Sequence, residues 1–114
     1  MADGVEQKLI VVITSDDDAE ELIRKLVERG YPATKVSSTG GFLRRGNATI
    51  FSGVDANDLD NVMVIIKTHC QARTEYVPAQ ALPFPESIYP AEPVQVRVGG
   101  AIVFVLPVER FEKT

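Results

Sequence analysis

The chain of 114 residues is long enough for one domain, and its 45% hydrophobic and 25% charged residues are typical of a globular protein rather than a disordered one. Acidic residues outnumber basic ones by 16 to 12, and the resulting net charge of −4 argues against a protein that grips nucleic acid through its phosphates. A single cysteine excludes an internal disulfide, and no stretch approaches the roughly 20 apolar residues of a membrane span, so we expect a cytoplasmic protein with one domain over residues 1–114.

The first elements in chain order are a buried strand and an amphipathic helix. The β-branched run at 9–13 is continuously apolar, which is typical of a strand buried on both faces. Ser15, with Asp18 three residues later, forms a variant of the capping box, so a helix is predicted over 16–29. Apolar residues recur along this helix at helical spacing, and Gly30 fits the left-handed stop just beyond its end.

Two strands joined by a glycine-rich connection come next. Residues 31–38 are predicted as a strand, with Pro32 near its start, where a missing N–H group is least harmful. The connection, 39–47, holds three glycines and an asparagine, which indicates unusual backbone angles. Residues 48–53 are predicted as the following strand.

The second half of the chain is predicted to hold another helix, a long loop and two strands. The helix begins at Asp55, which starts a capping box, and ends near residues 69–70. Four prolines within 71–92 forbid a long helix and prevent regular pairing, so we predict a long proline-rich loop there. The strands that complete the pattern are 94–98 and 101–106, separated by a glycine pair.

The order of these elements predicts an α+β fold. Its core is the ferredoxin-like plan βαββαβ, with an extra C-terminal strand. In this plan the helices pack on one face of a four-stranded antiparallel sheet and leave the other face to be covered by something else. Because the strands are apolar nearly throughout, we expect other copies of the chain to cover that face, as in a closed ring of three.

Catalytic groups are scarce in the sequence. His69 and Cys70 are adjacent at a helix end, and neighbours on a helix point about 100° apart. A nucleophile pair needs converging side chains and a metal site needs further ligands, so we assign both residues a structural role. The aspartates 16–18 suit helix capping better than a cation site. Since the phosphate-binding loop and the dinucleotide fingerprint are also absent, the sequence predicts no enzyme and no cofactor or metal.

The segment 40–47 is the strongest candidate for a functional site. Its glycines let a ligand approach the backbone closely, and exposed N–H groups can hold an anion. Phe42 and Leu43 are apolar and can pack on a base, while the two arginines that follow can pair with phosphate. Asn47 offers a donor and an acceptor that match an adenine edge. Taken alone, these residues leave two interpretations open: a nucleotide site, or a glycine-rich hairpin whose Phe42 fills a subunit interface.

The run over 34–47, Thr-Lys-Val-Ser-Ser-Thr-Gly-Gly-Phe-Leu-Arg-Arg-Gly-Asn, resembles the signature of the PII-like cyclic-di-AMP receptor family. The stretches 98–106 and 108–111 also resemble the C-terminus of that family, and the resemblance covers nearly the whole chain. It implies a homotrimer of ferredoxin-like subunits related to PII signalling proteins. The family binds cyclic di-AMP in clefts between subunits and has no known catalytic activity. The short connection after the second strand and the long loop after the second helix agree with this family.

The resemblance also implies a set of ligand contacts. Carried over residue by residue, they are Thr34, Gly41, Phe42, Leu43, Asn47, Gly53 and Phe104, with Arg44 and Arg45 as candidates for phosphate pairing. Thr34 and Asn47 would hydrogen-bond an adenine edge or a phosphate, and Phe42 with Leu43 would cover a base. Without catalysis, binding acts by shifting the populations of loop states. The loops 39–47 and 71–92 would then present a surface to a downstream protein, whose identity the sequence leaves open.

One position departs from the family pattern. The family often has a basic residue two positions before Thr34, whereas this chain has Pro32, which cannot pair with phosphate as arginine does. Loss of one charge-assisted contact costs roughly 1.5–3 kcal/mol, or about ten- to a hundredfold in affinity, unless Arg44 or Arg45 compensates. Two alternatives to cyclic-di-AMP sensing therefore stay open. One is a PII-like sensor of ATP, ADP or another small anion, and the other is a trimeric protein-interaction module with no small ligand.

Overall fold

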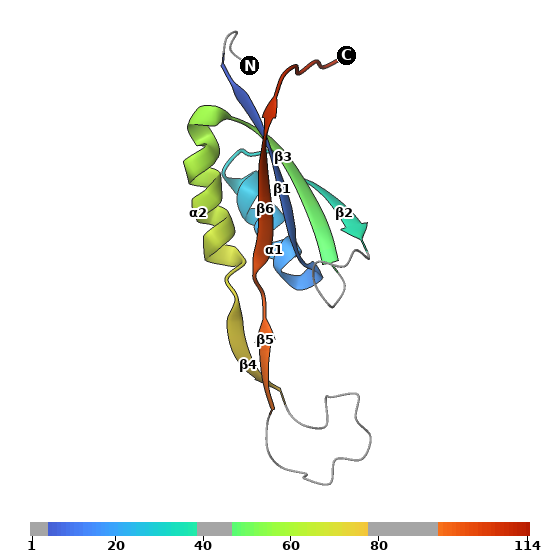
Figure 1. The fold of residues 1–114 in the computed structure, drawn as a ribbon, viewed down its shortest axis with the longest axis vertical. Coiled ribbons are helices and arrows are strands. Elements are labelled where there is room, and N and C mark those ends of the chain that lie inside the picture. The colour runs from blue at the N-terminus through green and yellow to red at the C-terminus, as the bar shows by residue number, and fades with distance from the viewer. Residues whose placement is uncertain (1–4, 39–46, 78–93) are drawn as a thin grey trace.

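The centre of the fold is a four-stranded antiparallel sheet in the order β2-β3-β1-β6 (Figure 1). The computed structural model describes residues 5–38, 47–77 and 94–114. Within these ranges the strands of the sheet are β1 Gln7–Ser15, β2 Thr34–Ser38, β3 Asn47–Asp55 and β6 Ala101–Val108. Because β1 pairs with β3 on one side and with β6 on the other, the connectivity is that of the split βαβ plan, and the predicted ferredoxin-like α+β fold is confirmed.

Both predicted helices are present. α1 spans Asp16–Glu28, and the Ser15 hydroxyl accepts a hydrogen bond from the Asp18 N–H at 3.3 Å, as the capping pattern predicts. α2 spans Leu59–His69 and begins later than predicted, because a turn of 3₁₀ helix, η1 Ala56–Asp58, precedes it. The predicted helix boundaries therefore hold to within one helical turn.

The hydrophobic core lies between the helices and one face of the sheet. Alternate residues of β1 and β3 are buried on this face, and they pack in one cluster with the inner faces of α1 and α2; the cluster includes Ile10, Val12, Leu22, Leu26, Ile50, Val62 and Ile66. The intervening residues of β1 are only half-buried. In a single chain this strand is therefore buried on one face only, because both helices cover the same side of the sheet, and burial of its other face by further copies stays a prediction.

A two-stranded ribbon extends beyond the end of the main sheet (Figure 1). It pairs β4 Arg73–Val77 with β5 Val94–Val98 in antiparallel register. The prediction of an irregular loop is thus wrong for 73–77, since the prolines of this segment begin only at Pro78 and leave the N–H groups of β4 available for pairing. The remainder of the predicted loop, 78–92, lies outside the described residues.

Two strands are thus added to the ferredoxin-like plan, β4 and β5, and both precede the last strand of the main sheet, whereas the sequence pattern predicts one added strand at the C-terminus. β6 takes the fourth place in the sheet beside β1, while β5 pairs with β4 outside the sheet. Gly99 and Gly100, with φ values of +80° and +90°, redirect the chain between β5 and β6. The Thr14 hydroxyl donates a hydrogen bond to the Gly100 carbonyl at 2.7 Å, which holds this joint against β1.

An ion pair ties the ribbon to α1. Arg73, the first residue of β4, contacts both carboxylate oxygens of Asp18, through Nη2 at 3.2 Å and Nη1 at 3.4 Å. Asp18 is buried, with 6% of its surface exposed, so it needs such a partner. This contact between β4 and the first turn of α1 helps to fix the orientation of the ribbon relative to the sheet.

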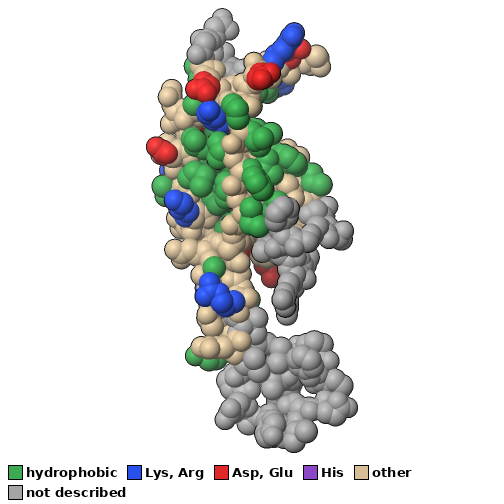
Figure 2. Space-filling view, viewed as in Figure 1, with side chains coloured by type: hydrophobic (Ala, Val, Ile, Leu, Met, Phe, Trp, Pro, Cys, Tyr) green, Lys and Arg blue, Asp and Glu red, His purple; other side chains and the backbone are tan. Residues whose placement is uncertain are grey.

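The second face of the main sheet is apolar and carries neither helix. In the register it presents Leu9, Val11 and Ile13 of β1 together with Phe51, Phe104 and Leu106 of the neighbouring strands. Figure 2 shows apolar side chains gathered over the middle of this face. Phe51, Phe104 and Leu106 are each 38–45% exposed, so the apolar side chains lie open in one chain, while their cover by other copies stays a prediction. None of the helices in the described ranges is long and apolar enough to cross a membrane.

Candidate functional site

The predicted ligand contacts fall on three strands and one connection. Thr34 begins β2, Asn47 and Gly53 belong to β3, and Phe104 belongs to β6. Outside the described residues lie the five predicted contacts of the connection between β2 and β3, namely Gly41, Phe42, Leu43, Arg44 and Arg45.

The open face of the sheet aligns several of these residues. Thr34 pairs with Phe51, which pairs with Val11, which in turn pairs with Phe104, and residues paired in this way share a face. Gly53 lies two residues along β3 from Phe51 and therefore faces the same side. β2 and β6 are the two outer strands, however, so three strand spacings, or about 14 Å, separate Thr34 from Phe104.

Asn47 lies at the other end of β3. It pairs with Ser15 and Ser38, where the connection between β2 and β3 begins, and only 3% of its surface is exposed. Four residues of strand, or about 13 Å, separate it from the row of Thr34 and Phe51. Within one chain, the structure thus brings Thr34 and Gly53 close together but keeps Asn47 and Phe104 apart from them.

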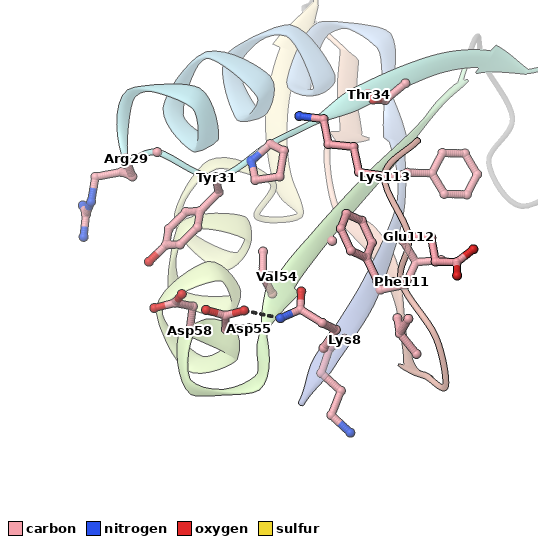
Figure 3. A pocket seen from close by; sticks show the side chains of 17 residues that line it. Lys8, Arg29, Tyr31, Thr34, Val54, Asp55, Asp58, Phe111, Glu112 and Lys113 are labelled. Carbon is pink, nitrogen blue, oxygen red and sulfur yellow. Dashed lines mark hydrogen bonds between the residues drawn. The ribbon is translucent and has the colours of Figure 1, made fainter. Parts of the chain in front are cut away.

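Thr34 and Gly53 share a groove with a volume of about 1100 Å³. The groove runs from the middle of the open face to the end of the sheet where β1 begins and β3 and β6 end (Figure 3). Its aromatic lining residues are Tyr31, Phe51 and Phe111; its cations are Lys8, Arg29 and Lys113; its carboxylates are Asp55, Asp58 and Glu112. The groove therefore combines apolar walls with charged groups of both signs near its rim.

Gly53 keeps the floor of this groove low. A Cβ atom added there would meet nothing within 4 Å, and the backbone of Gly53 does not have a positive φ. Neither the packing of a single chain nor its backbone conformation therefore requires glycine at this position. What the glycine does provide is open space on the sheet face beside Thr34.

Several groove residues were missed by the sequence analysis. Phe51 was assigned only to a strand, although its place two residues before Gly53 puts both on one face. Phe111 and Lys113 lie in the short charged tail after β6, where an aromatic residue among charged ones was the available signal. Pro32 also lines the groove, and its carbonyl accepts a hydrogen bond from the buried Ser52 hydroxyl at 2.6 Å.

The charged groups of the groove differ in their partners. Lys8 pairs with Glu6 at 2.9 Å, Asp55 accepts a hydrogen bond from the Gln7 amide, and Glu112 pairs with Arg110. Among the described residues, no salt bridge involves Lys113.

His69 and Cys70 lie outside this groove. The His69 Nδ1 atom is 3.6 Å from a carboxylate oxygen of Glu21 on α1. Cys70 is 3% exposed, and burial raises the pKa of its thiol to about 11. The thiol is therefore protonated at neutral pH, which makes it a poor nucleophile. Within the described ranges, no three potential ligands gather into a metal-binding group.

Comparison with protein families gives one match over most of the chain. A family model described as "Cyclic-di-AMP receptor" matches residues 7–114. The matched range includes every strand and helix of the structure, and it includes all the ligand contacts that the sequence analysis proposed.

Solved structures with the same fold include one protein of clearly related sequence. A functionally unknown protein from Pediococcus pentosaceus is 36% identical, with a TM-score of 0.78 over 97% of this chain and 100% of that one. The GlnK–ATP complex of B. subtilis has a TM-score of 0.58 at 15% identity, over 90% of this chain and 82% of GlnK. A DUF3240 family protein from Shewanella baltica has a TM-score of 0.56 at 11% identity, over 95% and 96% of the two chains. The latter two likenesses concern the fold alone.

Proposed function

Because the chain belongs to the cyclic-di-AMP receptor family, we propose that it is a signal protein that binds cyclic di-AMP and catalyses no reaction. The family match confirms the resemblance found in the sequence, and the fold shared with GlnK agrees with a PII-like protein. A nucleotide-sensing role follows from the family, while the particular ligand and its contacts are the proposal. We also propose a cytoplasmic location, as expected from the composition.

The observation that carries this proposal is the groove shared by Thr34 and Gly53. Its volume of about 1100 Å³ lies just above the roughly 300–1,000 Å³ of typical small-molecule pockets, so it has room for a dinucleotide. Phe51 supplies an apolar surface for a base, Thr34 supplies a hydroxyl, and Gly53 lets the ligand approach the sheet. Asn47, at the opposite end of β3, and the residues 41–45 that precede it in the chain are the further contacts that the proposed site would include.

We further propose that the ligand lies between subunits of a homotrimer. Thr34 and Phe104 occupy opposite edges of the sheet in one chain, so a compact ligand would not reach both of them there. A cyclic assembly that places the β6 edge of one copy beside the β2 edge of the next would bring the two residues to one site. The apolar open face supplies the surface that such an assembly would bury.

Two other candidates remain from the sequence analysis. A sensor of ATP or ADP is favoured by Pro32, which lines the groove without contributing a charge, and GlnK of the same fold was solved with ATP. An interaction module without a small ligand would use the ribbon or the open face alone. In every case the downstream protein partner stays unidentified.

Calorimetric titration of the purified protein with cyclic di-AMP tests the proposal, with ATP and cyclic di-GMP as comparison ligands. We expect selective binding of cyclic di-AMP at one ligand per subunit. Thr34→Val should weaken binding by about tenfold, because it removes a hydrogen-bonding hydroxyl at nearly constant volume. Thr68→Val, on the exposed surface of α2, is the matched control and should leave the affinity unchanged.

Each outcome of this titration separates the candidates. Heat with ATP but not with cyclic di-AMP would support the ATP sensor, and no heat with any ligand would support the interaction module. If cyclic di-AMP binds equally to the wild type and to Thr34→Val, the groove beside Thr34 is the wrong site.

A further inference from the structure

The groove beside Thr34 raises the question of which cation meets a phosphate group there. Cyclic di-AMP carries two phosphates, and charge-assisted hydrogen bonds are the strong contacts available to them. Pro32 lies in the groove wall and offers no charge. Resting on the proposed function, we infer that Lys113, in the tail after β6, is the residue that contacts a ligand phosphate in this groove.

The three cations of the groove are not equivalent. Lys8 already pairs with the Glu6 carboxylate at 2.9 Å. Arg29 is the C-cap of α1, and in Figure 3 its side chain points away from the other groove residues. Lys113 extends from the tail toward β2, on the side where Thr34 lies (Figure 3). Of the three cations, Lys113 is therefore the one whose side chain points toward the candidate ligand contact Thr34.

The tail as a whole is arranged to present Lys113. Phe111 and Lys113 both line the groove, whereas Arg110 and Glu112 form an ion pair with each other. The Glu112 carboxylate, the nearest acidic group along the chain, is thus engaged by Arg110 and competes less for the Lys113 ammonium group. Phe111 adds an aromatic side chain to the groove lining, although 56% of its surface is exposed.

The two parts of the groove would bind different groups of the ligand. The apolar part, with Phe51 and Phe111, would take a base, and the part between Thr34 and Lys113 would take a phosphate. Lys113 is exposed to solvent, so its attraction for phosphate is screened by salt. Its contribution to affinity should therefore be largest at low ionic strength.

The test compares variants of the full-length chain by calorimetric titration with cyclic di-AMP at low and at physiological salt. Lys113→Gln should weaken binding by about tenfold at low salt and reduce the salt dependence of the affinity. Lys113→Arg, which keeps the charge, should bind within about threefold of the wild type. Lys67→Gln, an exposed lysine on α2, is the matched control and should leave both the affinity and its salt dependence unchanged.

Two results would overturn the assignment of Lys113 while leaving the proposed function standing. One is a Lys113→Gln protein with the affinity and salt dependence of the wild type. The other is an equal loss in Lys113→Gln and Lys113→Arg, because that would point to packing rather than to charge. A wild-type protein that binds no cyclic di-AMP would instead overturn the proposed function together with this inference. Because the side chain of Lys113 is exposed, none of the three substitutions should alter the fold.

Discussion

At the scale of single residues, Pro32 contributes to the fold through its backbone rather than through its side chain. Its carbonyl, which any residue provides, accepts the hydrogen bond from Ser52 and holds the start of β2 against β3. Pro32 also lines the groove, and its side chain carries no charge. The backbone contact at position 32 therefore does not depend on the side chain there, and in the proposed site the phosphate contact falls to Lys113.

Cys70 gives a prediction that depends on burial alone. Because its pKa is raised to about 11, only about 0.1% of the thiol is ionised at pH 8. We expect the native protein to react slowly with a thiol reagent such as DTNB and the guanidinium-unfolded protein to react at once. The thiol is more acidic in the unfolded chain, so its contribution to stability should be lost as the pH rises from about 9 to 11. Rapid reaction of native protein at pH 8 would contradict this placement of Cys70.

At the scale of secondary-structure elements, the joint between ribbon and sheet depends on Gly99. A Cβ atom there would lie 2.4 Å from the Gln71 carbonyl oxygen and 2.5 Å from Arg73 Nη1. Arg73 also holds the buried Asp18 carboxylate, so a side chain at position 99 would disturb the contact between the ribbon and α1. The glycine is thus required by its neighbours as well as by its positive φ.

Two glycines with similar φ values allow the cost of the positive φ to be separated from the cost of steric crowding. Gly30, at +86°, has nothing within 4 Å of an added Cβ atom, whereas Gly99, at +80°, has close neighbours. We expect Gly30→Ala to cost about 1 kcal/mol of unfolding free energy and Gly99→Ala to cost roughly 1–3 kcal/mol more. Denaturant unfolding at one protein concentration measures both. Equal costs for the two variants would show that the crowding at Gly99 relaxes freely.

At the scale of the whole molecule, the open sheet face governs assembly. Its apolar side chains gain from burial, and a charge placed among them would oppose association. Leu106 is 44% exposed on this face, and Val64 is 63% exposed on α2. We expect the wild type and Val64→Asp to sediment as trimers at micromolar concentration and Leu106→Asp to sediment as a smaller species. A monomeric wild type would reject the trimer, and a trimeric Leu106→Asp protein would place the interface elsewhere.

Assembly and ligand binding are coupled in this proposal. If a ligand contacts Thr34 of one copy and Phe104 of the next, its binding stabilises the trimer by mass action. The β4–β5 ribbon is attached beside the sheet through Asp18, Arg73 and the Gly99–Gly100 joint. In this proposal, a ligand-induced change in the arrangement of the subunits would move the ribbon, because the Asp18–Arg73 ion pair and the Thr14–Gly100 hydrogen bond connect it to the main sheet and α1.

Most of the local structure was predictable from the sequence because its causes are local. The cap at Ser15, the stop at Gly30 and the helical spacing of apolar residues act within a few positions of each other and determine α1. Apart from β4, the order of strands and helices, and hence the fold class, also followed from local patterns. The family, too, could be recognised from a contiguous run, 34–47.

The ribbon, the strand register and the groove were decided by tertiary structure alone, because strand pairing joins residues that are distant in the chain. The strand at 73–77 exists through its partner at 94–98, and its own polar residues did not predict it. The register of β1 with β3 and β6 places Thr34, Phe51 and Phe104 in one row, yet it also puts the first and last of them on opposite edges. The fold also brings Lys113 of the C-terminal tail to the groove that Thr34 lines, although the two residues are far apart in the chain.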